Sequence, residues 1–274
     1  MVRWVRTKVL GSGTYGTVYQ AICEGYHKPI ALKTTALSSS ETLEKENKIL
    51  DALFGCPEII NSHGTEITCE DGIIVSNLMM EYAPYGTLGD LIKKGPLMET
   101  RTTKVYIQML LRGLSFMHQR GYVHCDLKPD NILMFPPYKY HDQRFNQLKI
   151  ADFGLCKTPE ESLNEEDWKF SFRGTPSYMS PESIACGQIG PALDIWSFGC
   201  VVLEMFTGYS WWVMEHCSLE DIMVRVGINN EAPSIPSGLS SLCKDFLQKC
   251  FIANPNERWT ADMLLHNHPF THIC

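Results

Sequence analysis

Two kinds of hydrophobic pattern follow each other along this chain. In residues 4–82 the β-branched and aromatic positions gather in short runs, which predict the strands of an antiparallel sheet. These runs are residues 9–10, 17–19, 30–32, 73–75 and 78–80. One helix is predicted among them, over residues 41–54, because a serine cluster precedes it and Gly55 and Pro57 follow it.

The pattern becomes helical after the turn-rich sequence APYG at residues 83–86. Apolar residues at helical spacing then predict helices over 88–92, 102–118, 193–206, 219–226, 239–250 and 260–265. A chain of 274 residues is long enough for one large domain of two lobes or for two closely packed lobes. We therefore expect an α+β fold with a β-rich N-lobe and an α-rich C-lobe.

Composition and charge argue against several classes of protein. The chain has 24 basic and 31 acidic residues, and its net charge of −7 argues against general binding to nucleic acid or to anionic membranes. No apolar run approaches the roughly 20 residues that a transmembrane helix needs. Eleven cysteines without a C-x-x-C pair, in a chain without a secretory signal, predict reduced thiols and a cytoplasmic protein, with nuclear entry left open.

A glycine-rich sequence lies near the N-terminus. Residues 11–18 have the sequence GSGTYGTV, in which Gly11, Gly13 and Gly16 would let the backbone close over phosphate groups. A plain structural turn is the alternative, and a Rossmann dinucleotide-binding turn would instead lead into a helix. Residues 17–21 are strand-like, which favours a β-hairpin flap.

Lys33 and Glu46 are the first candidate pair of charged residues. A solvent-exposed lysine at the end of a strand is the alternative interpretation of Lys33. At about 100° per residue, Glu46 lies within the apolar stripe of the predicted helix 41–54, whereas Glu44 lies on its far side. Because a carboxylate among apolar neighbours is costly unless it is paired, we expect Glu46 to pair with Lys33.

A second polar group is the sequence HCDLKPDN at residues 124–131. An isolated aspartate or asparagine in a loop is usually a turn former. Here Lys128 follows Asp126 by two residues and Asn131 follows it by five, which is the layout that phosphoryl transfer requires. Asp126 would receive the hydroxyl proton, Lys128 would contact the γ-phosphate, and Asn131 would bind magnesium. Asp152, which begins an Asp-Phe-Gly sequence, would bind magnesium bridging the β- and γ-phosphates.

In their order along the chain, these motifs resemble those of eukaryotic protein kinases, and the resemblance covers essentially the whole chain. It implies one kinase domain over residues 1–274, with the N-lobe at about 1–80, a hinge at about 81–86 and the C-lobe at about 87–274. It also implies that ATP and Mg²⁺ bind in the cleft of a bilobal fold. We expect catalysis of phosphate transfer from ATP to protein substrates.

The same resemblance assigns roles to individual residues. Met80 would be the gatekeeper, and the backbone of Glu81 and Ala83 would contact adenine. The nucleotide-binding residues that it implies are Leu10, Gly11, Ser12, Gly13, Gly16, Val18, Ala31, Lys33, Met80, Glu81, Ala83, Asn131 and Asp152. The catalytic residues are Asp126, Lys128, Lys33 and Glu46, and the magnesium ligands are Asn131 and Asp152.

Three further residues have structural roles by the same resemblance. Glu182 lies in Ser-Pro-Glu, where Ala-Pro-Glu is more common, and is expected to pair with Arg258. Asp194 is expected to anchor the backbone of the catalytic loop. These roles concern the fold and not the chemistry.

Substrate class follows from Lys128 and from the sequence Gly-Thr-Pro at 174–176, which resemble serine/threonine kinases more than tyrosine kinases. Residues 174–182 further resemble MEKK-like MAP kinase kinase kinases, especially the short plant members, although Ser180 and Ser183 depart from the commoner residues. This resemblance implies MAP kinase kinases as substrates, for a kinase that acts as a monomer or in transient complexes. A pseudokinase or scaffold module is the alternative, whereas a metabolic kinase or an oxidoreductase is disfavoured by residues 174–182, the substrate loop, because a long substrate loop implies a protein substrate.

Cys125 replaces the arginine that, in many kinases, pairs with a phosphorylated activation loop. We hypothesise that residues 152–182 become ordered without that contact. The acidic residues within 160–167 would supply standing negative charge, although a solvated acidic loop is the alternative interpretation. Candidate phosphorylation sites are Ser162, Ser171 and Thr175.

Two other patterns are interpreted structurally. His266, His268 and His272 lie close together in sequence, but their His-Pro-Phe context resembles the ordinary end of a kinase domain, so we do not expect a metal site. The tandem tryptophans at 211–212 are expected to pack against the C-lobe rather than to bind a ligand.

Overall fold

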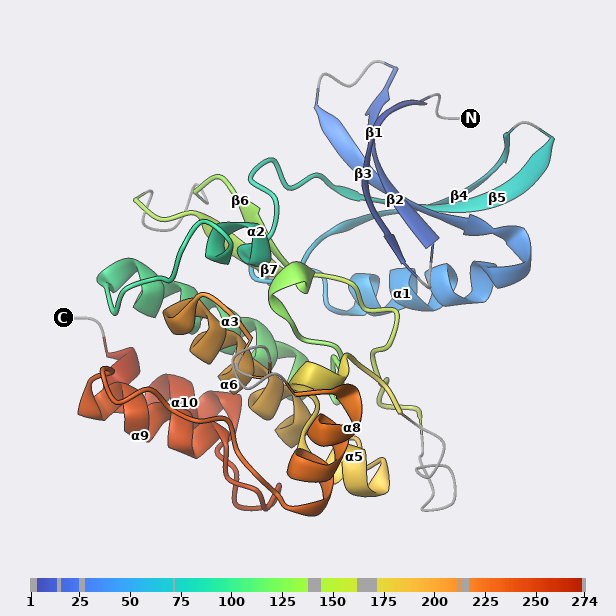
Figure 1. Cartoon of the computed structure of the whole chain (residues 1–274). Coiled ribbons are helices and arrows are strands. Elements are labelled where there is room, and N and C mark those ends of the chain that lie inside the picture. The colour runs from blue at the N-terminus through green and yellow to red at the C-terminus, as the bar shows by residue number, and fades with distance from the viewer. Residues whose placement is uncertain are drawn as a thin grey trace. The chain divides into compact units, whose positions relative to one another are not determined.

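The computed structural model of the chain divides into two compact units (Figure 1). The first unit comprises Met1–Pro84 and Ala151–Gly154, and the second comprises Tyr85–Ile150 and Leu155–Cys274. The structure describes residues 4–13, 16–24, 28–70, 72–137, 144–161, 172–210, 212 and 217–272. The first unit is mainly β and the second mainly α, which confirms the predicted α+β fold with a β-rich and an α-rich lobe.

A five-stranded antiparallel sheet forms the first unit, in the order β1-β2-β3-β5-β4. Its strands are β1 (Trp4–Gly13), β2 (Gly16–Cys23), β3 (Pro29–Ala36), β4 (Ser62–Glu70) and β5 (Ile73–Glu81). Because β3 lies between β2 and β5, Lys33 pairs in register with Val18 on one side and with Leu78 on the other. Lys33 is thereby held in the middle of the sheet.

Two details of this sheet differ from the sequence prediction. The runs at 73–75 and 78–80 belong to one strand, β5, and β4 was not predicted. The reason for the second error is that β4 is an edge strand with the largely polar sequence SHGTEITCE, in which Ile67 is exposed and not buried. Such a strand lacks the apolar run on which the prediction relied.

Helix α1 (Ser40–Ala52) confirms the helix predicted over 41–54 and packs against β4 and β5. Its buried face consists of Leu43, Glu46, Ile49 and Leu50. These residues lie at the spacing of three and four that brings side chains onto one side of a helix. A glutamate is thus buried among three aliphatic side chains, as the helical spacing predicted.

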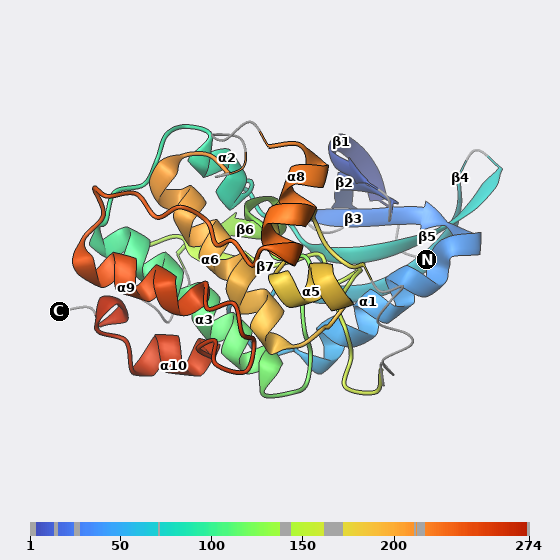
Figure 2. The same cartoon turned by 60° about the horizontal axis from the view of Figure 1, so that its bottom comes forward.

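The second unit consists mainly of helices, with a short two-stranded sheet (Figure 2). Its α-helices are α2 (Leu88–Ile92), α3 (Arg101–His118), α5 (Pro181–Cys186), α6 (Pro191–Thr207), α8 (Leu219–Ile222), α9 (Ser241–Cys250) and α10 (Ala261–His266). Both α3 and α9 pack against α6. None of the helices in the described ranges is long and apolar enough to cross a membrane.

Helix α6 is the core element of this unit. Twelve of its residues are buried, including Trp196 and Phe198, so the helix is apolar on nearly all sides rather than on one face. Trp196 packs edge-on against Phe251, with the ring centres 5.2 Å apart, and Phe198 packs against Phe246 in the same way. Asp194 belongs to this buried set, and its position is therefore fixed by the packing of the whole helix.

The two-stranded sheet of β6 (Ile132–Phe135) and β7 (Gln147–Ile150) follows the catalytic-loop sequence directly. The 3₁₀ turn η2 (Pro129–Asn131) immediately precedes β6. Because Ile132 pairs with Ile150 and both are fully buried, the end of the loop is held by the sheet.

The helix predicted over 219–226 is the least accurate of the helical predictions. Only α8 is α-helical there, and Met223–Ile228 (η4) forms a π-helix in which the amide of Asn229 donates to Val224 O at 3.0 Å. Gly227 approaches Ile184 of α5 so closely that a Cβ atom would lie 2.2 Å from its Cγ2. Close packing against α5 therefore accompanies the local change of helix type.

Other predictions fall partly or wholly outside the described residues. Trp212 is 3% exposed and donates to Ser177 O at 3.0 Å, which confirms the expected packing, whereas Trp211 lies outside the described residues. The same holds for Ser162, Ser171 and most of the acidic segment 160–167.

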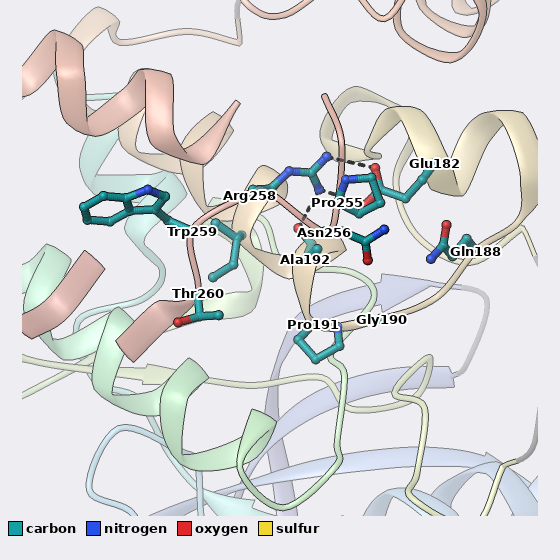
Figure 3. Close-up of a pocket in the computed structure, with 11 residues that line it drawn as sticks. Glu182, Gln188, Gly190, Pro191, Ala192, Pro255, Asn256, Arg258, Trp259 and Thr260 are labelled. Atoms are coloured by element: carbon teal, nitrogen blue, oxygen red, sulfur yellow. Dashed lines mark hydrogen bonds and ion pairs between the residues drawn. The ribbon is translucent and has the colours of Figure 1, made fainter. Parts of the chain in front are cut away.

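Glu182 and Arg258 form a buried ion pair in the second unit, as expected (Figure 3). Two nitrogens of Arg258 contact the two carboxylate oxygens of Glu182 at 2.7 and 2.9 Å, and Arg258 also donates to the carbonyls of Ala192, Ile252 and Ala253. A cavity of about 260 Å³ lies beside this pair. Since Arg258 uses its donors within the protein, the pair fixes α5, and with it the end of the substrate loop.

Loss of this buried pair is predicted to destabilise the protein. Glu182→Gln should lower the free energy of unfolding by about 3 kcal/mol or more, because it leaves the guanidinium of Arg258 buried without a carboxylate. Glu231→Gln is the matched control, since Glu231 also binds an arginine, Arg225, through both oxygens, but its side chain is 40% exposed. The control should cost less than about 1 kcal/mol. Equal losses in urea unfolding followed by circular dichroism would contradict the prediction.

Candidate active site

Lys33, Glu46 and Asp152 form a charged cluster in the first unit. Lys33 Nζ lies 2.6 Å from Glu46 Oε2 and 2.8 Å from Asp152 Oδ1. The amide of Phe153 donates to Glu46 Oε1 at 3.1 Å. The expected pairing of Lys33 with Glu46 is therefore present, and Asp152 joins it. The alternative of a solvent-exposed lysine is wrong, because Lys33 is only 5% exposed.

Burial and charge act in opposite directions on this cluster. Burial alone would lower the pKa of Lys33, but the carboxylates of Glu46 and Asp152 outweigh it and raise the pKa above its ordinary value. Burial raises the pKa of Glu46, and Lys33 and the Phe153 amide counteract that effect. The ammonium group is therefore kept charged in a site from which water is largely excluded.

Asp152 adopts a backbone conformation that non-glycine residues rarely adopt, with φ of +65°. Its side chain is 40% exposed, in contrast with the buried Lys33 and Glu46. Such strained conformations persist only when surrounding contacts hold them, and they concentrate at functional sites. One oxygen of Asp152 binds Lys33, and its partly exposed carboxylate can accept a cation.

The expected adenine-site residues lie on the sheet of the first unit. Ala31 pairs in register with Met80, and both side chains are buried. Val18 is half-buried next to Lys33, and Leu10 is 39% exposed. The sheet thus places Ala31, Met80 and Val18 on neighbouring strands.

The described residues of the glycine-rich sequence, 11–13 and 16–18, pair at the ends of β1 and β2 in the predicted hairpin. Gly11 pairs with Val18, and Gly13 pairs with Gly16. Gly16 has φ of +124°, and a Cβ atom there would lie 2.3 Å from Thr34 O, so only glycine fits. At Gly11 and Gly13 an added Cβ would meet nothing within 4 Å.

Ser12 of this hairpin, with Glu81 and Ala83 at and after the end of β5, completes the predicted nucleotide-binding set. Ser12 Oγ lies 3.2 Å from Thr17 Oγ1 across the hairpin. Glu81 ends β5, and its carboxylate accepts a hydrogen bond from the amide of Asn61 at 2.7 Å. Ala83 follows in an irregular segment and is half-buried.

Asp126 is the centre of a polar cluster in the second unit. Its Oδ1 accepts a hydrogen bond from the Thr175 hydroxyl at 2.7 Å. Its Oδ2 lies 2.9 Å from Lys128 Nζ and 3.2 Å from Asn131 Nδ2. Lys128 also donates to Thr175 Oγ1 at 2.8 Å. The loop spacing predicted the first three residues, and the contact with Thr175 confirms that this residue lies near Asp126, as the resemblance of residues 174–176 to serine/threonine kinases implies.

Asp194 of α6 holds the backbone that leads into Asp126. It is fully buried and accepts hydrogen bonds from the amides of His124 and Cys125, at 2.8 and 2.9 Å. The ring of His118 at the end of α3 lies 2.8 Å from the same carboxylate. Cys125 has φ of +69°, so this anchor holds a strained residue directly before Asp126. The expected anchoring role of Asp194 is confirmed.

Contacts that were not predicted from the sequence fix the substrate loop to α6. The Tyr178 hydroxyl donates to Glu204 Oε2 at 2.6 Å, and Ser197 Oγ donates to Tyr178 O at 2.7 Å. Burial raises the pKa of Glu204. Glu204, near the end of the largely apolar stretch 193–206, was the available signal, because a carboxylate among apolar residues needs a polar partner.

The C-terminal histidines have structural partners. His268 is 1% exposed, with its ring nitrogen 2.9 Å from Asp245 Oδ2 and its ring packed against Phe246 and Trp259. In the part of the chain that the structure describes, no group of three or more histidine, cysteine, aspartate and glutamate residues is arranged to hold a metal ion.

Comparison with known proteins agrees with this geometry. The family model described as "Protein kinase domain" matches residues 4–271. Mitogen-activated protein kinase kinase kinase 20 of Arabidopsis thaliana is 39% identical, over 99% of this chain and 79% of that protein. Mitogen-activated protein kinase kinase kinase 17 of the same plant is 39% identical, over 98% of this chain and 69% of that protein.

A more distant relative shows the same similarity. The MAP kinase kinase kinase SSK2 of Saccharomyces cerevisiae is 32% identical, over 96% of this chain but only 18% of that protein. Together with the Lys33 and Asp126 clusters, these matches leave one conclusion. The chain belongs to the protein kinase family and is an ATP-dependent serine/threonine kinase.

Proposed function

We propose that this kinase acts at the MAP kinase kinase kinase level of a cascade and phosphorylates serine or threonine hydroxyls of MAP kinase kinases. Its plant and yeast relatives share the name MAP kinase kinase kinase, which supports the place in the cascade. The observation that carries the catalytic part is the 2.7 Å contact between the Thr175 hydroxyl and Asp126.

Asp126 is assigned as the base. Its Oδ1 accepts a hydrogen bond from an aliphatic hydroxyl, which is the geometry needed to take the proton of a substrate serine or threonine. Lys128 and Asn131 fix the other oxygen, so the carboxylate cannot rotate freely. We assign Lys128 to the transferred phosphate. Its ammonium group contacts both Asp126 and Thr175, so this cation lies beside the proposed base and would contact the phosphate that is transferred there.

Asn131 and Asp152 are assigned as the magnesium ligands. The Nδ2 of Asn131 donates to Asp126 O at 2.8 Å, so its side-chain oxygen is the atom that would bind the magnesium ion. Asp152 offers a carboxylate that is 40% exposed. Oxygen ligands of this kind suit Mg²⁺, which when bound neutralises charge on the phosphates. Lys33, which Glu46 keeps charged, would also bind the ATP phosphates.

The remaining nucleotide contacts are also proposals. Gly11, Gly13 and Gly16, with Ser12 in the same hairpin, would approach the phosphates through their backbone. Adenine would lie against Leu10, Val18, Ala31 and Met80 and would contact the backbone of Glu81 and Ala83. The N-lobe at 1–80, the hinge at 81–86 and the C-lobe at 87–274 belong to the same proposal.

A scaffold that only binds nucleotide is not favoured. That class usually lacks a lysine, aspartate or asparagine that phosphate transfer needs. Here Lys33, Asp126, Asn131 and Asp152 are all present, and Lys33 and Asp126 lie in the polar clusters described above. We propose a cytoplasmic enzyme, with nuclear entry left open, that acts as a monomer or in transient complexes.

Asp126→Asn tests the proposed base. Transfer of labelled γ-phosphate to a panel of catalytically inactive MAP kinase kinases should fall by about 10²- to 10⁴-fold in kcat, because the amide cannot accept the proton. Phosphoamino-acid analysis of the wild-type product should give phosphoserine or phosphothreonine.

Asp130→Asn is the matched control for this experiment. It makes the same change in the same loop, but the side chain of Asp130 is 64% exposed and its contact with Lys93 is long, at 3.9 Å. Its activity should stay within about threefold of wild type. Wild-type transfer no greater than that of Asp126→Asn would contradict the assignment, as would phosphotyrosine.

Lys33→Met tests whether Lys33 acts on ATP or only on stability. The single change should abolish transfer and also destabilise the fold by about 3–5 kcal/mol, because the Glu46 carboxylate stays buried without its cation. The double variant Lys33→Met/Glu46→Met should recover most of the stability and none of the activity. Recovery of phosphate transfer in the double variant would show that Lys33 is only structural.

A further inference from the structure

Cys125 cannot itself supply a cation to bind a phosphate. The side chain is 2% exposed and packs among Val123, Leu155 and Ile189. Its thiol donates to Val123 O at 3.4 Å, and burial raises its pKa, so it stays neutral. The described residues within 152–182 must therefore be ordered by contacts of side chains other than Cys125.

An ion pair within the segment lies close to this cysteine. Arg173 NH1 is 2.8 Å from Glu161 Oε2, and the two side chains are 22% and 25% exposed. The two atoms in contact are shielded from solvent, although their angles are not those of a linear hydrogen bond. Partial burial strengthens the attraction relative to an exposed surface pair.

The residues on both sides of this ion pair are attached to the catalytic loop. On the first side, Lys157 and Val123 exchange two backbone hydrogen bonds, at 2.8 and 3.1 Å, and the amide of Glu161 donates to Thr158 O. The bridge between Val123 and Lys157 therefore holds the segment that leads to Glu161 next to the residue that precedes His124.

The chain after Arg173 lies directly against Cys125. Gly174 has φ of +115°, and a Cβ atom there would lie 2.4 Å from Cys125 O. The next residue, Thr175, donates its hydroxyl to Asp126. A shift of Arg173 would therefore move Gly174 away from Cys125 and Thr175 away from the base.

We propose that Glu161 and Arg173 are a positioning pair, which holds the start of the substrate loop against the catalytic loop in place of a phosphate–arginine contact. The carboxylate of Glu161 takes the part of the phosphate, and Arg173 supplies the cation that Cys125 cannot. Within the acidic segment 160–167, Glu161 therefore has a structural role and is not only a solvated acidic residue. The inference rests on the proposed function, because it concerns the orientation of Thr175 toward Asp126.

The test compares kcat and KM for ATP in the phosphatase-treated chain, with a generic protein as phosphate acceptor. The variants are Glu161→Gln, Arg173→Gln and the charge-reversed double variant Glu161→Arg/Arg173→Glu. Glu160→Gln is the matched control, because Glu160 is the neighbouring glutamate and is exposed. Binding of ATP is measured separately by the shift in melting temperature.

Each single variant should lower kcat by about 3- to 30-fold, whereas KM for ATP and the ATP-induced shift in melting temperature should stay unchanged. The double variant should recover most of the wild-type kcat. The phosphatase-treated wild type and Glu160→Gln should be fully active. Single variants with the kcat of Glu160→Gln, or a double variant no better than the singles, would overturn the positioning role while leaving the kinase assignment intact. Activity that is present in the untreated wild type but lost on phosphatase treatment would also overturn the positioning role. An untreated wild type no more active than Asp126→Asn would overturn the proposed function itself.

Discussion

The buried carboxylate of Asp194 is the interaction on which the catalytic loop depends. Helix α6 is buried on nearly all sides, so the position of Asp194 is set by the packing of the second unit as a whole. The carboxylate accepts two consecutive amides, those of His124 and Cys125, and holds Cys125 at a positive φ. A charged acceptor is needed here, because hydrogen bonds to ionised groups are stronger and have to offset the strain.

From this anchor the polar contacts extend outward in one connected series. Asp126 follows the strained Cys125 and binds Thr175, while Gly174 lies against the carbonyl of Cys125. Because only glycine fits that contact, backbone geometry rather than side-chain chemistry brings the substrate loop to the base. The pair of Glu161 and Arg173 then acts one residue before Gly174, where a small displacement has a direct effect on Thr175.

Much of the site followed from spacing in the sequence, because its chemistry is local. Asp126, Lys128 and Asn131 lie within six residues, so their proximity in the structure is nearly dictated by the chain. Glu46 was found because helical periodicity places one carboxylate in an apolar stripe, and its pairing with Lys33 followed from the cost of burial. The order of elements and the α+β class followed from the change of hydrophobic pattern near residues 83–86.

The missed features depend on contacts that are distant in sequence or on packing. Strand β4 has no apolar run, because it is an edge strand, and the π-helix at Met223–Ile228 accompanies the close approach of Gly227 to α5. Tyr178 and Glu204 are 26 residues apart, and nothing in the local sequence pairs them. Glu161 looked like one acid among five, since only the fold brings Arg173 to it.

Hydrogen exchange of the catalytic loop in Asp194→Asn tests the central role of Asp194 most directly. The carboxylate accepts from His124 through Oδ2 and from Cys125 through Oδ1, and in asparagine an N–H₂ group, which cannot accept, replaces one of these two oxygens. Exchange of the peptide over residues 122–128 should become at least tenfold faster, while peptides from the sheet of the first unit keep the wild-type rate. Unchanged exchange over 122–128 would contradict the account, because the loop would then hold its strained conformation without the carboxylate.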